Sequence, residues 1–220
     1  LQPRAHNPTG WSHDAGRMER MADLLDGTDV FVIEDDHSGE VSGAPLYSLG
    51  TRMPDRVVHI RSFSKAYGPD LRLAAIGGAA PVVDAVVHRR QLGPVWSSRL
   101  LQNVLLNLLT DPATTEIVAR AEAAYAERRS TLVDCLADHG IAVPGRSGFN
   151  LWLEVEDETN ALIALSAGGI GAAPGSPFVV GNGGGSHLRL TVATVAGDFG
   201  ELAAVIAQAA SIPPGRRVGA

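Results

Sequence analysis

The single lysine of this sequence, Lys65, is the residue best suited to covalent chemistry. Of the 18 basic residues, it is the only one that is not an arginine. A lysine amine can lose its proton and attack a carbonyl carbon, whereas an arginine guanidinium stays protonated and planar. Either the chain needs an amine at this position, or a surface lysine has been kept there by chance.

The residues around Lys65 are typical of a phosphate site. Ser62, Ser64 and Arg72 flank it in the segment RSFSKAYGPDLR, and hydroxyls with a guanidinium are a common phosphate-binding set. An amine beside a phosphate site suggests a cofactor that carries both an aldehyde and a phosphate. Pyridoxal phosphate (PLP) has both groups, and Lys65 would bind it as a Schiff base. The alternative is a solvated loop with a surface lysine.

Two further segments carry groups that PLP chemistry uses. Asp35 lies in the acidic run EDDH, and a carboxylate there can pair with a protonated pyridine nitrogen, which improves the ring as an electron sink. Asn7 lies in the turn NPTG, where its amide can donate to the phenolic oxygen of the cofactor. A solvated acidic turn and an ordinary Asn-Pro turn remain the alternatives. Asp35 and Asp36 are adjacent, so both cannot point inward.

The elements that must position these residues form an α/β pattern. Strands are predicted at Asp29–Glu34 as a buried parallel strand, at Val57–Ile60 and at Leu71–Ile76. Helices are predicted between Trp11 and Asp29 with Ser12 as a possible cap, at Pro81–Arg90, and at Ser97–Leu109 with an apolar leucine-rich face. The Lys65 loop follows a strand, which is where α/β proteins place their sites.

A smaller α+β unit is predicted after Asp111. A long helix runs to about His139 and ends at Gly140, with Arg129 among the residues of its polar side. The unit continues with strands at Asn150–Val155 and His187–Val192 and helices at Asn160–Ala167 and Asp198–Ala210. The segment GNGGGS at 181–186 reads as a flexible hairpin loop. The predicted organisation is 1–110, 111–211 and a disordered tail at 212–220.

Composition excludes several classes of protein. The formal net charge of −6 gives no basic surface for nucleic acid, and 45% hydrophobic residues suit a globular chain. No apolar run is long enough to span a membrane. One cysteine, Cys135, rules out an internal disulfide and suits a reducing cytoplasm, and it reads as a core residue rather than a reactive thiol. The histidines show no metal-ligand spacing, so no metal is predicted.

The motifs AHNPTG, VIEDDH and SFSKAYGPDLRLAAIGG, in this order, resemble the second half of a fold type I (aspartate aminotransferase-like) PLP protein. The resemblance continues to HLRLTVA and covers nearly the whole chain. It implies an α/β fold: the C-terminal half of a PLP-transferase large domain, with a mainly parallel sheet and helices, followed by a smaller α+β C-terminal domain. It also implies a two-fold dimer, here a homodimer.

The resemblance assigns roles residue by residue. Lys65 and Asp35 match the catalytic pair, namely the Schiff-base lysine and the pyridine-nitrogen aspartate. The implied cofactor-binding residues are Asn7, Asp35, His37, Ser62, Ser64, Lys65 and Arg72. Arg189 matches the arginine that clamps a substrate α-carboxylate, with a structural salt bridge as the alternative. His37 stands where the family usually has a tyrosine whose hydroxyl contacts the ring oxygen.

Within this fold, EDDHSGE and the Lys65 segment are most similar to the aminotransferase-like domain of MocR regulators, which are transcription factors of the GntR family. This resemblance implies an effector domain that binds PLP and an amino compound or amino acid, and that reaches DNA only through an upstream winged helix-turn-helix. The alternatives are a class I/II aminotransferase acting on an amino acid and a 2-oxo acid, and a truncated dimerisation module without a ligand.

The sequence begins at Leu1 and runs directly into QPRAHNPTG, so we expect a fragment. The resemblance implies that the ring that stacks on the cofactor, and the backbone amides of the phosphate cup, come from residues before Asn7. The chain is therefore expected to carry half of a binding site.

Overall fold

The computed structural model describes residues 1–181 and 185–214. It divides into two compact units, the first made of Leu1–His6 and Ser12–Ala123, and the second of Asn7–Trp11 and the chain from Ala124 onward. The first unit contains α1 (Ala15–Leu25), β1 (Val32–Asp36), β2 (Val57–Ser62), β3 (Ala74–Gly78), α2 (Ala80–Gln91) and α3 (Arg99–Thr110). The second contains β4 (Asn150–Glu154), α5 (Glu158–Ala167), β5 (Ala173–Pro174), β6 (His187–Thr191) and α6 (Phe199–Ala210).

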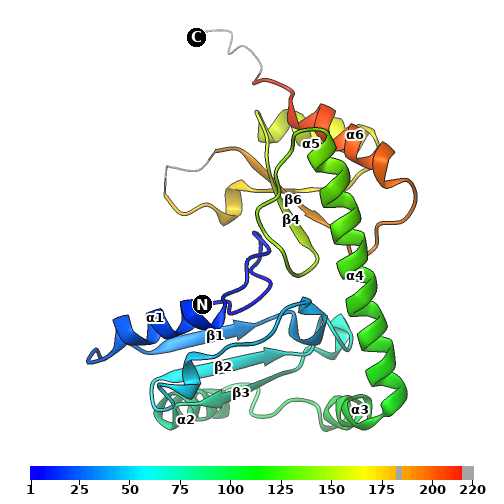
Figure 1. The fold of residues 1–220 in the computed structure, drawn as a ribbon. Helices are drawn as coiled ribbons and strands as arrows, with labels where there is room; N and C mark the ends of the chain where they lie inside the picture. The colour runs from blue at the N-terminus through cyan, green and yellow to red at the C-terminus, as the bar shows by residue number, and fades with distance from the viewer. Residues whose placement is uncertain (182–184, 215–220) are drawn as a thin grey trace. The chain divides into compact units, whose positions relative to one another are not determined.

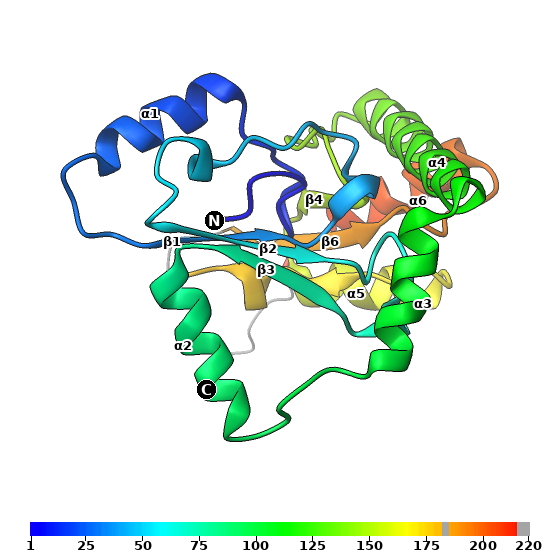
Figure 2. The same ribbon diagram turned by 90° about the horizontal axis from the view of Figure 1, so that it is seen from below.

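The sheet of the first unit has the order β1-β2-β3. β1 and β2 are parallel, as predicted for the first strand, and β3 runs antiparallel to β2, so this part of the sheet is mixed. β2 begins at the predicted residue and extends to Ser62, and β3 begins three residues later than predicted. Helices α1 and α2 lie on opposite faces of this sheet (Figure 2).

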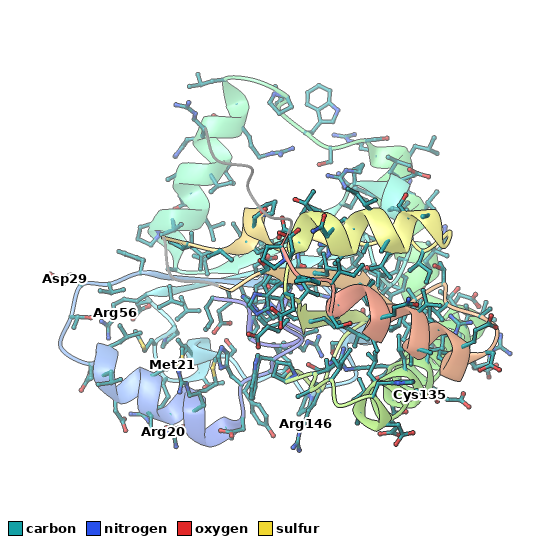
Figure 3. All side chains as sticks on the ribbon, turned by 90° about the horizontal axis from the view of Figure 1, so that it is seen from above. Arg20, Met21, Asp29, Arg56, Cys135 and Arg146 are labelled. Carbon is teal, nitrogen blue, oxygen red and sulfur yellow. The ribbon has the colours of Figure 1, made fainter. Side chains whose placement is uncertain are left out.

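The core of the first unit forms between α1 and the sheet. Met18, Ala22, Leu49, Met53 and Val57 are buried together there. The helix begins after Asp14, whose side chain accepts from the Arg17 amide, so the cap predicted at Ser12 is wrong. Ser12 instead accepts a hydrogen bond from the backbone of Ala5. At the other end of α1, Arg56 donates to the carbonyl of Leu25 at 3.0 Å (Figure 3).

The burial of β1 differs from the prediction of an apolar buried strand. The strand is displaced by three residues at its start and by two at its end, to Val32–Asp36, and its fully buried side chains are Glu34 and Asp36, both 0% exposed. Phe31 and Ile33 are more than half exposed. Alternation along a strand puts consecutive side chains on opposite faces, and the acidic face of β1 is covered both by Arg4, which precedes the strand, and by Ser48 and Leu49, which follow it.

The helices α2 and α3 occur close to their predicted positions. α3 begins after Ser98, whose hydroxyl accepts from the Leu101 amide. Among its residues only Leu105 is buried, and Leu100 is 74% exposed. Of the other residues of the predicted apolar face, Leu101 and Leu108 are half-buried and Val104 is exposed.

Helix α4 (Pro112–Asp138) is the predicted long helix, and it ends just before Gly140, whose φ of +77° suits a glycine after a helix. The boundary between the two compact units falls inside this helix; a domain boundary near Asp111 stays a prediction. Arg129, predicted on the polar side of this helix, is buried, with 4% of its surface exposed. Cys135, also on α4, is half-buried (Figure 3).

The second unit is an antiparallel sheet of order β4-β6-β5 with α5 and α6 together on one face (Figure 1). Leu151 and Leu153 of β4 and Leu188 and Leu190 of β6 are buried, as the predicted alternation requires. Residues between them, such as Trp152 and Arg189, occupy the other face and are only half-buried. This second face carries the polar groups discussed below.

The predicted hairpin loop at 181–186 and the predicted tail at 212–220 lie partly outside the described residues. Among the residues that are described, no helix is long and apolar enough to cross a membrane. Within 1–181 and 185–214, no three His, Cys, Asp or Glu side chains are grouped so that they could hold a metal ion.

Candidate PLP site

Six of the eight predicted site residues lie at one edge of the first unit's sheet. β1 and β2 are parallel with Asp36 opposite Arg61, so both strands end at the same edge. β3 is antiparallel with Ala74 opposite Ser62, so it begins there. The register therefore gathers six residues that lie in or next to these strand ends. They are Asp35, His37, Ser62, Ser64, Lys65 and Arg72.

Of the predicted site residues between the end of β2 and the start of β3, Lys65 and Arg72 are exposed, whereas Ser62 and Ser64 are half-buried. Lys65 is exposed in a turn, and Ser64 donates from its backbone amide to the Ser62 hydroxyl at 3.4 Å. Arg72 has φ +50° and ψ 36°, a left-handed conformation uncommon for a residue with a Cβ. Such backbone outliers persist where the surrounding structure holds them, often at ligand sites. The loop thus offers an amine, two hydroxyls and a guanidinium within eleven residues.

The structure separates the two adjacent aspartates. Asp36 turns toward the buried side of the sheet, whereas Asp35 is half-buried on the opposite face. Asp35 accepts a hydrogen bond from the Gln2 side-chain amide at 3.1 Å, and its backbone amide donates to the Leu1 carbonyl. Of the two carboxylates, Asp35 is the one that can meet a ligand, because Asp36 is enclosed by arginines.

Asp36 is held in a buried ion pair. Arg4 donates two hydrogen bonds to its carboxylate, at 2.9 and 2.8 Å, and Arg61 lies 3.4 Å away. Burial alone would raise the pKa of Asp36. The hydrogen bond and charge of Arg4, together with the charges of Arg61 and His59, outweigh burial and hold the pKa below its usual value.

Glu34 is fixed on the same buried face. Its two oxygens accept from the Ser48 hydroxyl and the Leu49 amide, both at 2.7 Å, and His59 contacts it at 3.0 Å. Glu34 and Asp36 are thus both locked on one face of β1, and strand alternation then directs Asp35 to the other.

His37 is held by the protein through both ring nitrogens. Its Nε2 lies 2.9 Å from the Ala5 carbonyl and its Nδ1 lies 3.1 Å from the Ser38 hydroxyl. A carbonyl only accepts, so Nε2 carries a proton and donates. A contact between His37 and a cofactor oxygen would require one of these two hydrogen bonds to be exchanged.

The two remaining site residues meet in the second unit. Arg189 of β6 donates from Nη1 to the Asn7 Oδ1 at 3.1 Å. Within 1–181 and 185–214, the Nε of Arg189 is buried without a hydrogen-bond partner, and its guanidinium lies 5.2 Å from the ring centroid of Phe178. An unpartnered buried N–H on a guanidinium is what a bound carboxylate would satisfy. No salt bridge of Arg189 occurs among the described residues; its role stays a prediction.

Three contributors to this second site were not predicted. Asn150 donates to Asn7, Thr191 donates to Asn150, and Arg129 donates to the Asn150 carbonyl. Burial lowers the pKa of Arg129 to about 10. Asn150 is a polar residue at the start of an alternating strand, and its side chain lies on the face opposite the leucines. That position could have marked it as a site residue in the sequence.

The donor set fits PLP chemically. The first unit supplies an amine, hydroxyls, a guanidinium and a carboxylate at one sheet edge, and the second supplies an arginine whose buried Nε has no hydrogen-bond partner among the described residues. The amine suits an aldehyde, the hydroxyls with the guanidinium suit a phosphate, and the carboxylate suits a pyridine nitrogen. The arginine of the second unit suits a substrate carboxylate.

The fold is that of aspartate aminotransferase-like proteins. The structure of LysN, an α-aminoadipate aminotransferase from Thermus thermophilus complexed with N-(5'-phosphopyridoxyl)-L-leucine, matches it with a TM-score of 0.83 and 24% identity, over 95% of this chain and 57% of that one. The family description "Aminotransferase class I and II" matches residues 2–206. The chain belongs to the aminotransferase class I and II family, which indicates pyridoxal phosphate as the cofactor.

Two curated relatives are transcriptional regulators. The vitamin B6 salvage pathway transcriptional repressor PtsJ of Salmonella typhimurium is 35% identical over 213 residues, which are 95% of this chain and 49% of the relative. The HTH-type transcriptional regulator TauR of Rhodobacter capsulatus is 30% identical over 79% of this chain and 38% of its own length. The chain therefore spans half or less of the length of these relatives.

Proposed function

We propose that this chain belongs to a PLP-binding, aminotransferase-like effector domain of a cytoplasmic MocR-type regulator. The observation that carries the cofactor assignment is the register of β1, β2 and β3, which gathers Asp35, Lys65 and Arg72 at one edge. The regulator assignment is supported by 35% identity, over 95% of the chain, to a transcriptional repressor of the vitamin B6 salvage pathway.

In this proposal each side chain has one task. Lys65 binds the cofactor covalently through Nζ, and Ser62, Ser64 and Arg72 bind its phosphate. Asp35 holds the proton at the pyridine nitrogen, and Asn7 donates to the phenolic oxygen. PLP, when bound, supplies an aldehyde that condenses with amines and a ring that withdraws electrons. Arg189 binds the carboxylate of an amino acid or related amino compound.

The partners follow from the same proposal. An amino compound or amino acid is the effector, a second copy of the chain forms a homodimer, and DNA is contacted through an upstream winged helix-turn-helix. The effector acts by favouring one conformation of the domain over another. A coding sequence without a winged helix upstream of Leu1 would remove the regulator assignment.

A working aminotransferase is the second candidate. The observation in its favour is the orphaned Nε of Arg189, because a carboxylate clamp serves a transaminase as well as a sensor. In an enzyme, Lys65 would also move a proton at the substrate Cα as a general base.

The uniqueness of Lys65 makes the cofactor assignment directly testable. The protein is incubated with PLP, reduced with borohydride and digested with trypsin. Condensation at Nζ releases water, and the added hydride then converts the C=N bond into a stable secondary amine. Because a modified lysine resists trypsin, we expect the phosphopyridoxyl mass on the peptide Ser62–Arg72, together with a visible absorbance band before reduction.

Lys65→Arg is the matched control, since it keeps the positive charge but cannot form the imine. It is expected to lose both the mass and the band. If the arginine variant keeps the visible band, or if the mass is found on another peptide, Lys65 is not the attachment site. Asp35→Asn should weaken PLP binding at unchanged thermal stability.

The regulator and the enzyme are separated by adding amino acids to the PLP-loaded protein. A change in affinity for the promoter DNA of its own gene, without stoichiometric release of a 2-oxo acid, supports the regulator. Multiple turnovers of 2-oxo acid production, without an effect on DNA binding, support the aminotransferase.

A further inference from the structure

We propose that Asn150 is a positioning residue that, together with Arg189, holds Asn7 as a hydrogen-bond donor toward the ligand. Asn150 is 7% exposed at the start of β4. Its Nδ2 lies 3.3 Å from the Asn7 Oδ1, the atom that also accepts from Arg189 at 3.1 Å. This inference rests on the proposed function, because it concerns the same ligand site.

The orientation of each amide in this cluster follows from the arginine. A guanidinium has only donors, so the Asn7 atom that faces Arg189 is its oxygen. An oxygen that accepts from Arg189 requires a donor from Asn150, so the nitrogen of Asn150 faces Asn7. The oxygen of Asn150 then faces Thr191, whose hydroxyl donates to it at 3.1 Å. The hydrogen bonds therefore allow only one orientation of the Asn7 and Asn150 amides, although the nitrogen and oxygen of a side-chain amide have nearly the same shape.

The backbone places these groups reliably. Asn150 and Thr191 are directly opposite one another in the antiparallel β4–β6 pair, and Trp152 is opposite Arg189. Their side chains are neighbours on one face because cross-strand partners stand side by side. Arg129, itself buried, donates to the carbonyl of Asn150 and fixes the start of the strand.

The consequence concerns the other end of the Asn7 amide. Oδ1 accepts from both Asn150 and Arg189, so the other polar atom of the Asn7 side chain is Nδ2, a donor, which is the atom that the proposed function assigns to the phenolic oxygen. A donor stabilises an oxygen that carries negative charge, such as a phenolate. The same contact holds Nη1 of Arg189, so Nε and the rest of the guanidinium stay available to a carboxylate. Asn150 thus acts on the ligand through Asn7 without touching it.

Three variants test this role. Asn150→Asp keeps the shape but replaces the donor with a second acceptor, which repels the Asn7 Oδ1 that Arg189 holds. Thr191→Val keeps the shape but removes the hydroxyl that orients Asn150. Thr191→Ser is the matched control, because it retains that hydroxyl. Circular dichroism and thermal melting identify which variants fold.

For Asn150→Asp with PLP bound, we expect the pH midpoint of the visible absorbance to rise by about one unit, since the loss of one hydrogen bond to a charged group is of that size. Affinity for maleate, used as a carboxylate probe, should fall about tenfold by calorimetry. Thr191→Val should shift both quantities in the same direction by less, and Thr191→Ser should leave them unchanged.

The cofactor-free protein provides a second readout. The side-chain ¹H–¹⁵N signals of Asn7 should move in Asn150→Asp and in Thr191→Val, but not in Thr191→Ser. Failure of the wild-type protein to bind PLP would remove the proposed function and leave these signals to decide the positioning role. Folded Asn150→Asp protein with unchanged Asn7 signals, absorbance midpoint and maleate affinity would overturn the proposal.

Discussion

Replacing Asp36 tests whether its buried ion pair stabilises the edge that carries the candidate site. Asp36 is fully buried, and Arg4, which donates two hydrogen bonds to it, is 9% exposed. Asp36→Ala leaves the guanidiniums of Arg4 and Arg61 without the carboxylate that they share. Removal of one partner from a buried pair leaves an uncompensated charge in a poorly solvated site.

The magnitude follows from that loss. Breaking a buried ion pair costs about 3–5 kcal/mol of unfolding free energy, most of it from the charge left behind. Asp36→Asn keeps the shape and one acceptor oxygen, so it should cost less. Asp55→Ala, at an exposed position before β2, should change the free energy by less than about 0.5 kcal/mol.

The assay is urea denaturation followed by circular dichroism, repeated as a function of pH. The folded-state pKa of Asp36 is lowered, so its contribution to stability is present above its unfolded pKa of about 3.9 and is lost as pH falls through the folded value. The wild-type protein should therefore lose stability below about pH 4 more steeply than Asp36→Asn. If Asp36→Ala is as stable as Asp55→Ala, the ion pair does not stabilise this edge.

Three further predictions concern other parts of the chain. Gly145→Ala should destabilise the second unit by about 1–3 kcal/mol or prevent its folding, because the new Cβ would lie 1.9 Å from the Thr9 carbonyl oxygen; chemical denaturation measures it. Leu151→Ala should cost about 2–5 kcal/mol, whereas Leu24→Ala, 79% exposed, should cost little, and equal melting temperatures would contradict the assigned core. Burial and nearby positive charge lower the pKa of His6, so stability should fall as pH drops below about 6.5, and His6→Gln should reduce that fall in melting temperature.

Much of the first unit's site follows from local chemistry in the sequence. A lone lysine between serines and an arginine, after a β-branched strand, indicated both the cofactor class and the sheet edge. The helices predicted from apolar periodicity and caps occur within a few residues of their observed bounds. Strand boundaries were less accurate, because half of the apolar run before Glu34 lies outside β1 and three of its four residues are exposed.

The contacts that orient the site were not predictable from spacing. Arg4 and Asp36 are 32 residues apart, and Asn7 and Arg189 are 182 apart, so nothing local pairs them. Arg129 was expected only to lie on the polar side of its helix, and the structure buries it against backbone carbonyls. A charged residue on a long helix has the same local pattern whether solvent or another segment covers it.

The sequence by itself determined which chemical groups this protein offers, because an amine, hydroxyls and carboxylates are properties of single residues. The tertiary structure decided which of them can meet a ligand. Asp35 and Asp36 are adjacent and identical in type, and only the enclosure of Asp36 by Arg4 and Arg61 distinguishes them. In the same way, Arg189 orients the amide of Asn7 only because β6 brings it there. Side-chain orientation depends on long-range pairing, and burial then fixes it by making every unsatisfied polar group costly.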